Sequence, residues 1–434
     1  MSSAAVLFRF RSDLRLHDQP ALQAALGMGC RRLLPVFCMP EVAEATPGGL
    51  ERVGPHRRAF LADTLRDLGG RLAGLGNPLR VCRAPAAQAL PALTRAAGAD
   101  TVVCEEIAAP QQEVQVAALR SAGLGVQAVW QGRLLHPADL PWPTAGLSQV
   151  FITFGQAVER ASIAPAYPLP APDVPPVALQ AAGAAAGLGG WLNEAAGRGG
   201  QDPRSSFRYG NAACRGGETA ALSHWAQYLE RRLPHSYKAT RNGLAWVDRS
   251  SKLSPWLAAG AISPRRAMAD LKAFEREHRA NNGRYWLWFE LQGRDYFRLM
   301  HLQHGEQLHR ARGLSTAPLA PHDAQGFERW RHGCTGERQV DASMRELAAT
   351  GYLSNRLRQV AASYLIHDLE GDWRAGAAWF ESQLVDHDVY RNQGNWLYIA
   401  GRGTDPRGGR RFDPAQQARV HDPDGRYRRL WGTA

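Results

Sequence analysis

Apolar and polar positions follow two alternating patterns along the first third of the chain. Short apolar runs such as AAVLFRF, RRLLPVFCM and DTVVCEE have the length and composition of buried strands. Between them lie Ala-, Leu- and Arg-rich stretches of helical period, for example PHRRAFLADTLRDLGGRLA. Strands that alternate with helices indicate a parallel sheet with helices on both faces. We therefore expect an α/β domain over residues 1–135.

The pattern changes in the next two parts of the chain. Residues 136–215 are rich in Pro, Ala and Gly, as in APAYPLPAPDVPP, which is typical of a connector that runs over a surface. From 216 to 434 the apolar positions recur at helical spacing, and most of the thirteen tryptophans lie there. Tryptophan at this density usually packs in a core. The predicted fold is α/β plus all-α, in which a connector joins the sheet domain to a helical domain.

Composition and charge limit the function classes. A net charge of +12 favours a polyanionic partner such as nucleic acid, although an Arg-rich composition can also reflect base bias in the genome. The six cysteines form no CxxC pair, which predicts reduced thiols and no metal site. No apolar run is long enough for a membrane span, and the start of the chain lacks the order of a secretory signal. We expect a cytoplasmic protein that does not enter membranes.

The α/β domain lacks the usual nucleotide-binding signatures. No GxGxxG follows the first strand, and no phosphate loop is present, which argues against a nucleotide-dependent transferase. Two interpretations of this domain stay open, a nucleotide-binding domain and a scaffold domain with a weak or secondary ligand.

Four polar stretches in the helical part do not fit a plain core. In the first, several hydroxyl side chains and one cation come just before a helix that we expect to begin at Pro255. These side chains can bind phosphate or simply cap the helix. In the second, Glu290 and Arg294 share a helical face. They form either an ion pair exposed to solvent or, in a cleft, polar contacts for a ligand. The third and fourth supply Asn355 with Arg358, and then Asp386, Asp388 and Asn392 within LVDHDVYRNQGNWLYIAG.

These stretches resemble one known family. Their order and spacing are similar to those of the flavin-binding half of the photolyase and cryptochrome family, and closest to its DASH branch. The stretches that carry this similarity are YKATRNGL, SSKLSPWLAAGAISPR, RDYFRLM, TGERQVDASMREL and DVYRNQGNW. The opening FRFRSDLRLHDQPAL and the closing FDPAQQARVHDPDGRYRRLW are similar to that family too. The resemblance therefore covers nearly the whole chain apart from the connector.

The resemblance implies an antenna domain followed by a helical domain that holds FAD in a folded, U-shaped conformation. It implies that Asn392 faces the flavin N5, that Asp386 pairs with Arg358, and that Asp388 lies near the isoalloxazine and ribityl groups. A neutral amide beside N5 suits a flavin that gains charge. The residues implied to bind FAD are Tyr237, Ser250, Ser251, Lys252, Leu253, Ser254, Arg294, Asn355, Arg358, Asp386, Asp388 and Asn392.

The implied activity is light-driven repair of cyclobutane pyrimidine dimers by an electron from reduced flavin, in UV-damaged and preferably single-stranded DNA, by a monomer. Glu290 would bond the base edge of the dimer, and Tyr398 would lie against it. Trp396 and Trp373 resemble the family's relay of electrons to the flavin. Phosphate contacts would come from Arg402, Arg407, Arg410 and Arg411, for which a solvated basic loop is the alternative.

Three departures from the family pattern bear on these roles. Gly293 stands where the family usually has a tryptophan that stacks on the lesion. The outer relay tryptophan falls near Leu319 and Ala320. The antenna is commonly a folate, 5,10-methenyltetrahydrofolate, held by a glutamate and a lysine; Glu113 matches the glutamate, whereas the lysine region reads GEQLHRA.

Two functions of different class therefore stay open. One is a photolyase-type carbon–carbon lyase, and the other is a blue-light receptor that binds FAD and DNA and repairs little. Signalling cryptochromes usually carry a long C-terminal extension, whereas this chain ends three residues after Trp431, which favours the enzyme. Gly293 favours the receptor.

Overall fold

A computed structural model of the chain describes residues 5–39, 49–172, 177–178, 202–279, 281–319 and 321–432. Its strands form one parallel sheet in the order β3-β2-β1-β4-β5, with β6 beside the first half of β2. The strands are β1 (Ala5–Phe10), β2 (Arg32–Cys38), β3 (Arg80–Cys82), β4 (Thr101–Glu105), β5 (Gly125–Val129) and β6 (Val177–Ala178).

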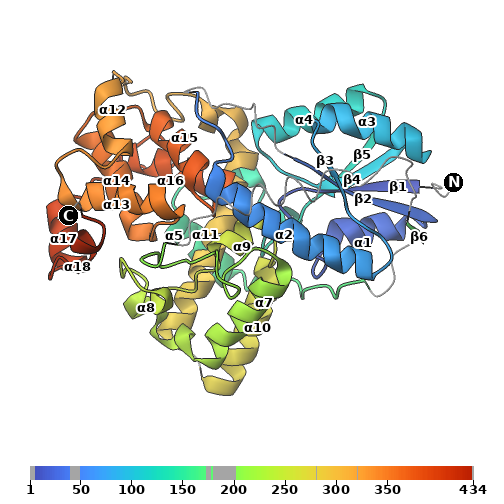
Figure 1. The fold of residues 1–434 in the computed structure, drawn as a ribbon, viewed down its shortest axis with the longest axis horizontal. Coiled ribbons are helices and arrows are strands. Elements are labelled where there is room, and N and C mark those ends of the chain that lie inside the picture. Colours follow the sequence, from blue (N-terminus) through green and yellow to red (C-terminus); the bar gives the residue numbers. More distant parts are fainter. Residues whose placement is uncertain are drawn as a thin grey trace.

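Helices cover both faces of this sheet (Figure 1). On one face, α1 (Pro20–Gly27) and α2 (Pro55–Gly74) pack on the side chains of Val6, Phe8 and Phe10. On the other face, α3 (Ala86–Ala97) and α4 (Pro110–Ser121) pack on Ala5 and Leu7. Because successive strand residues face opposite sides, a strand covered on both faces must be apolar throughout, as β1 and β2 largely are. The predicted parallel sheet is confirmed.

The rest of the described chain is mainly helical, and its helices share one large apolar core. Its α-helices are α5 (Phe151–Arg160), α7 (Glu218–Glu230), α8 (Tyr237–Thr240), α9 (Ser254–Ala259), α10 (Pro264–His278), α11 (Asn282–His304), α12 (Ala324–Arg331), α13 (Arg338–Thr350), α14 (Asn355–His367), α15 (Trp373–Gln383), α16 (Val389–Ile399), α17 (Pro414–His421) and α18 (Arg426–Leu430). Short 3₁₀ turns are η1 (Pro137–Asp139), η2 (Thr144–Gly146), η3 (Leu233–Ser236), η4 (Val247–Arg249) and η5 (Gly305–His309).

The predicted connector is described in part. Its first half contains α5, which packs on α11 with the rings of Phe154 and Tyr296 5.4 Å apart. Residues 173–176 and 179–201 of the connector lie outside the described residues. The domain boundaries at 135 and 215 stay predictions.

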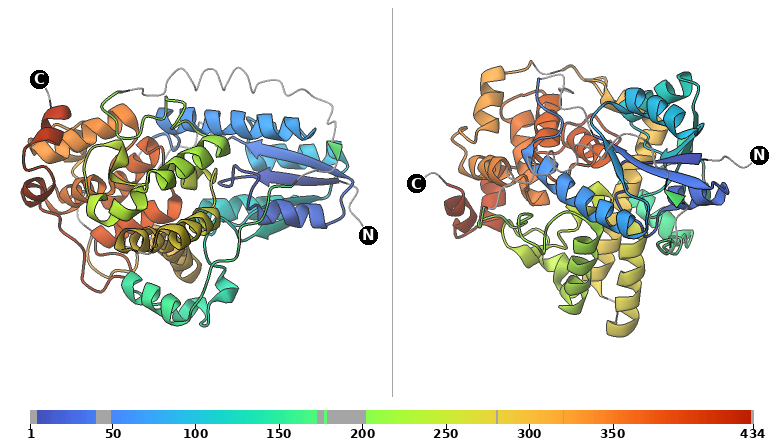
Figure 2. Two further views of the ribbon diagram at one scale, coloured as in Figure 1. Left: turned by 90° about the horizontal axis from the view of Figure 1, so that it is seen from below. Right: turned by 45° about the vertical axis from the view of Figure 1, so that its right-hand side comes forward.

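The sheet and the helical part are in direct contact (Figure 2). Helix α2 reaches the helical part, where the amide of Gly54 donates to the carbonyl of Ser382 over 3.0 Å. At the end of α9, Gly260 has a φ of +70°, and a Cβ there would collide with the carbonyl of Ser12. This glycine lets the loop after β1 approach α9, beside the site described below.

None of the described helices combines the length and apolar character that crossing a membrane would require.

Candidate functional site

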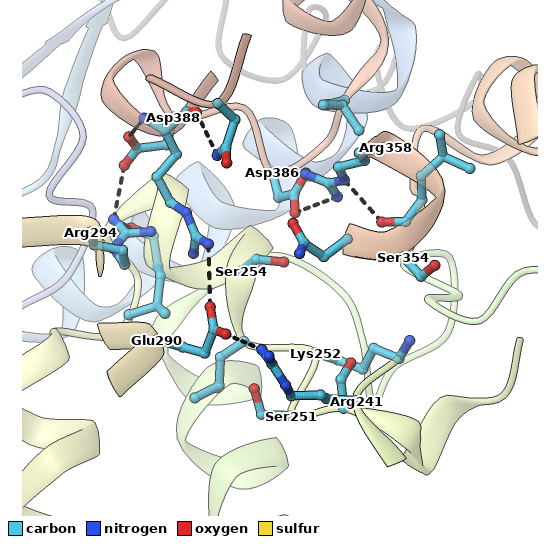
Figure 3. Close-up of a pocket in the computed structure, with 18 of the residues that line it drawn as sticks. Arg241, Ser251, Lys252, Ser254, Glu290, Arg294, Ser354, Arg358, Asp386 and Asp388 are labelled. Carbon is cyan, nitrogen blue, oxygen red and sulfur yellow. Dashed lines mark hydrogen bonds and ion pairs between the residues drawn. The ribbon is translucent and has the colours of Figure 1, made fainter. Parts of the chain in front are cut away.

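A buried cavity lies among α9, α11, α14 and α16, and we call it the first cavity (Figure 3). All the residues that the resemblance assigns to FAD line it, as do Glu290 and Trp396. These residues come from positions 237 to 396, so the fold collects them from all four polar stretches.

The serine run forms one wall of the first cavity. Helix α9 begins at Ser254, and its N-cap residue, Leu253, makes no side-chain cap. Lys252 is buried, has a φ of +55°, and donates to the hydroxyl of Ser206 over 3.2 Å. Burial lowers the pKa of Lys252 to about 8, although the carboxyl of Glu346 acts to raise it. Since no serine side chain caps α9, capping does not explain why these hydroxyls gather here.

Asp388 organises a buried ion network on the opposite wall (Figure 3). Its Oδ2 lies 3.0 Å from Nη2 of Arg294 and 3.3 Å from Nη2 of Arg133, while Oδ1 accepts the amides of Tyr390 and Arg391 as the N-cap of α16. Burial acts to raise the pKa of Asp388, but the two guanidinium groups outweigh it and hold that pKa far below its usual range. The carboxylate stays ionised at physiological pH.

A second ion pair lies where α14 begins. Arg358 donates from Nη2 to Oδ2 of Asp386 over 2.8 Å and from Nε to the carbonyl of Leu353 over 3.0 Å. Oδ1 of Asp386, the hydroxyl of Ser354 and Nε of Arg294 are buried without a partner among the described residues. An unpaired buried polar group costs about 1 to 3 kcal/mol. Three such groups on the walls of one cavity fit a polar ligand.

Asn392 lies on α16, four residues after Asp388 in the chain. Its amide nitrogen donates to the carbonyl of Ala377 over 3.0 Å, which holds the side chain in place on the cavity wall.

Glu290 and Arg294 share the cavity but have different partners. Glu290 pairs with Arg241 and lies 3.7 Å from Nη2 of Arg391, whereas Arg294 pairs with Asp388 (Figure 3). Glu290 is 29% exposed, so it lies at the rim. Sequence reasoning did not single out Arg133, Arg241 or Arg391. The only signal for Arg241 was its place four residues after Tyr237 in YKATRNGL.

Two predicted aromatic residues lie away from the cavity lining. Trp373 is buried and donates from Nε1 to the carbonyl of Ala311 over 3.0 Å. Tyr398 accepts a hydrogen bond of 2.8 Å from Nε of Arg410. The aromatic rings nearest to Trp396 are those of Phe380, at 5.1 Å, and Trp330, at 6.3 Å.

Two positions that depart from the family pattern, Gly293 and Leu319, lie outside the lining of the first cavity. Gly293 is buried on α11, and a Cβ there would meet the ring of Phe151 on α5 at 3.5 Å. It does not line the first cavity. Leu319 is 44% exposed, and Ala320 lies outside the described residues.

The four predicted DNA-binding arginines differ in availability. Arg402 is buried and donates to the carbonyls of Ala317 and Pro318, so it holds a loop in place. Arg407 and Arg411 are exposed and paired with Asp405 and Asp368. These surface ion pairs are weak and can exchange for phosphate.

A second cavity lies between the sheet and the helical part. Arg11, Arg57 and Glu105 line it at the carboxyl ends of the strands and on α2. It shares Leu257, Arg294, His387, Asp388 and Asn392 with the first cavity. Glu113, predicted to hold a folate, is exposed in the first turn of α4 and lines neither cavity. Folate binding stays a prediction.

No group of three or more His, Cys, Asp or Glu side chains suited to a metal ion occurs in the described ranges.

Comparison with known proteins agrees with this geometry. Residues 6–174 match the family described as DNA photolyase, and residues 286–433 match the FAD binding domain of DNA photolyase. The chain is 40% identical to a cryptochrome DASH of Gloeobacter violaceus, covering 99% of this chain and 86% of that protein. It is 37% identical to a cryptochrome DASH of Xenopus laevis, covering 99% and 82%.

Solved structures give the same result. A Synechocystis cryptochrome superimposes with a TM-score of 0.90 at 36% identity, covering 98% of this chain and 88% of that one. A class III photolyase from Agrobacterium tumefaciens gives a TM-score of 0.82 at 30% identity, covering 99% and 87%.

Proposed function

Because the chain belongs to the photolyase and cryptochrome family, we propose that it repairs cyclobutane pyrimidine dimers with light, preferably in single-stranded DNA. The observation that carries this proposal is the first cavity, whose polar wall residues are those expected around FAD and whose rim holds a carboxylate, Glu290. When bound in its reduced form, FAD would supply an electron to the lesion after absorbing light and take it back once the dimer has split.

The residues of the first cavity suit FAD in charge and polarity. Ser250, Ser251 and Ser254 offer hydroxyl groups, and Lys252 offers a cation, on the wall where we place the phosphates and ribityl chain. The unpaired Oδ1 of Asp386 and the unpaired hydroxyl of Ser354 offer hydrogen bonds to further polar groups of the cofactor. We place Asn392 beside the flavin N5, where its neutral amide avoids the repulsion that a carboxylate would exert on added negative charge.

Glu290 would recognise a base of the lesion. A carboxylate at the rim accepts hydrogen bonds from base N–H groups, and Arg241 and Arg391 hold it there. Tyr398 would lie against the lesion, and Arg407, Arg410 and Arg411 would contact phosphates. A damaged pair must leave the duplex to reach a buried cavity, and in single strands that cost is smaller. Action as a monomer and the cytoplasmic location stay predictions.

One observation favours the alternative function of a blue-light receptor that binds FAD and DNA with little repair. In the sequence, Gly293 stands where the family usually has a tryptophan that stacks on the lesion, and such stacking contributes about 1 to 3 kcal/mol.

One experiment separates the two functions. The FAD-loaded protein is chemically reduced and illuminated with an oligonucleotide that carries one pyrimidine dimer, single- and double-stranded in parallel, with a dark control. The proposal predicts light-dependent loss of the dimer, faster in the single strand, and slower loss with Glu290→Gln at equal flavin content. If the wild type binds both flavin and oligonucleotide yet leaves the dimer intact, the receptor function stands instead.

A further inference from the structure

Two cysteines lie side by side at the carboxyl ends of neighbouring strands. Cys38 is the last residue of β2, Cys82 is the last residue of β3, and the parallel register pairs their Cα atoms directly. Paired residues of adjacent strands point to the same face of a sheet, and both side chains here pack into the apolar cluster under α3. The amide of Met39 donates to the carbonyl of Cys82 over 2.8 Å, so the backbones remain joined beyond the pair.

The two thiols have different environments. Cys38 is buried, whereas Cys82 is half-buried on the edge strand of the described sheet. The interaction between the two thiols lowers the pKa of Cys82 and raises that of Cys38. Partial burial opposes the lowering at Cys82, and the guanidinium of Arg80 supports it. An accessible thiolate beside a cation is the environment of a reactive cysteine.

Other cysteines of the chain lack this combination. Burial raises the pKa of Cys30, Cys104 and Cys214, so these thiols stay protonated. Cys334 is exposed but lies on the helical part, far along the chain from the pair. The pair therefore differs from the other cysteines in the direction of the Cys82 pKa shift and in the pairing of two cysteines across neighbouring strands.

We propose that Cys82 and Cys38 form a reactive dithiol that hydroperoxides oxidise to a disulfide. The Cys82 thiolate attacks one peroxide oxygen and breaks the O–O bond, which gives a sulfenic acid on Cys82 and, with hydrogen peroxide, one water after protonation. The Cys38 sulfur then displaces the sulfenic oxygen as a second water and forms the S–S bond. The two thiols lose two electrons and two protons in total, and the peroxide takes up both.

The strand spacing permits this bond. Adjacent strands lie about 4.7 to 4.9 Å apart, and disulfides span Cα separations of about 4.4 to 6.8 Å. Because the two strands are already paired, closing the bond does not require them to move apart or change register. This site does not depend on the proposed repair activity.

Peptide mapping of the full-length protein tests the site. The reduced protein receives a small excess of hydrogen peroxide, free thiols are then blocked with iodoacetamide, and digestion shows which cysteines are linked. We expect a Cys38–Cys82 cross-link that dithiothreitol reverses, formed at the same rate in the control variant Cys104→Ser. In Cys38→Ser, dimedone should trap a sulfenic acid on Cys82, whereas in Cys82→Ser Cys38 should stay unmodified.

The wild-type map decides the question even if a variant fails to fold. Peroxide that oxidises the exposed Cys334 while leaving Cys38 and Cys82 unlinked in the folded protein would overturn the proposal. A second test compares the rates at which iodoacetamide labels Cys82 and the half-buried Cys214 at neutral pH, before oxidation. We expect Cys82 to react at least about tenfold faster, since one pKa unit changes the thiolate fraction about tenfold. Labelling of Cys82 that is no faster than that of Cys214 would also overturn the proposal.

Discussion

Arg358 donates a 2.8 Å hydrogen bond to Oδ2 of Asp386, and Oδ1 of the same carboxylate is buried without a partner among the described residues. One oxygen of this carboxylate is thus committed to the protein, and the residue lines the first cavity. The same division occurs at Arg294, whose Nη2 pairs with Asp388 while its Nε has no partner in the described ranges. The walls of the cavity are held rigid by ion pairs and still offer polar atoms to a ligand.

The first prediction concerns Asp388. Asp388→Ala removes the counter-ion of two buried arginines, Arg133 and Arg294, and the N-cap of α16. We expect the free energy of unfolding in urea to fall by about 3 to 5 kcal/mol, together with loss of bound flavin. Asp388→Asn is the matched control, because an asparagine still caps the helix and should lose less stability. Equal stability of the alanine variant and the wild type would contradict the role given to this network.

The second prediction concerns pH. Burial raises the pKa of Glu346 from 4.5 to about 8, although the Tyr427 hydroxyl and Lys252 act to lower it. The folded chain therefore keeps a proton that the unfolded chain loses, so this contribution to stability is present below about pH 4.5 and is lost as the pH rises toward about 8.

Glu346→Gln cannot titrate, so its free energy of unfolding should fall less than that of the wild type between about pH 5 and 8. Urea unfolding at a series of pH values measures this slope, with Glu230→Gln on the exposed end of α7 as the control. Parallel curves for Glu346→Gln and the wild type would refute the assignment.

The third prediction concerns electron supply to the flavin. Trp396 lines the first cavity, so Trp396→Phe should nearly abolish photoreduction by external thiols while FAD stays bound. Trp373→Phe should slow it less. The ring of Trp330 lies 6.3 Å from Trp396, so adding Trp330→Phe to the Trp373 variant should slow it further.

Photoreduction per bound flavin is the quantity to compare, because a packing defect would change flavin occupancy and leave this rate intact. A rate for Trp396→Phe within about twofold of the wild type would eliminate Trp396 as the immediate donor. Repair by chemically reduced protein should survive these substitutions.

The fourth prediction concerns DNA. Arg410 contacts the Tyr398 hydroxyl, and Arg411 pairs with Asp368 on the surface. Replacing both by alanine should weaken oligonucleotide binding and reduce the slope of log affinity against log salt by up to about two phosphate contacts. The matched control removes the same charge from the α/β domain through Arg95→Ala and Arg120→Ala, which are exposed on α3 and α4. Equal slopes in both double variants would make the Arg410 segment a solvated loop.

The fold could be predicted from the sequence because its strands are covered on both faces. Continuous apolar runs and helical periods are local signals, and they located the sheet domain and the helical part. The helix α5 was missed, because Pro- and Gly-rich segments on either side made the whole region look like a connector. Its periodic side chains, such as Phe154, pack on α11 in the structure.

The cavity could be predicted only in part, for a different physical reason. The polar stretches and the family resemblance marked the residues that line it, whereas Arg133 was missed because its partner, Asp388, is 255 positions away. A single arginine near a predicted connector carries no local sign of a distant carboxylate. Contacts of this kind depend on how the sheet packs against the helices, which residue spacing does not reveal.

The claim on which the others depend is that the first cavity, and not the second, holds the flavin. Ser254 and Ala258 lie four residues apart, at the start and near the end of α9; Ser254 lines the first cavity and Ala258 lines the second. Ser254→Trp and Ala258→Trp therefore insert the same side chain from one helix into different spaces.

The measurement is the amount of FAD per folded chain after reconstitution, from the visible spectrum and the protein concentration, with folding checked by circular dichroism. We predict about one FAD in the wild type and in Ala258→Trp, and almost none in Ser254→Trp. Retention of FAD by a folded Ser254→Trp variant, with its loss from Ala258→Trp, would place the flavin in the second cavity and contradict the account.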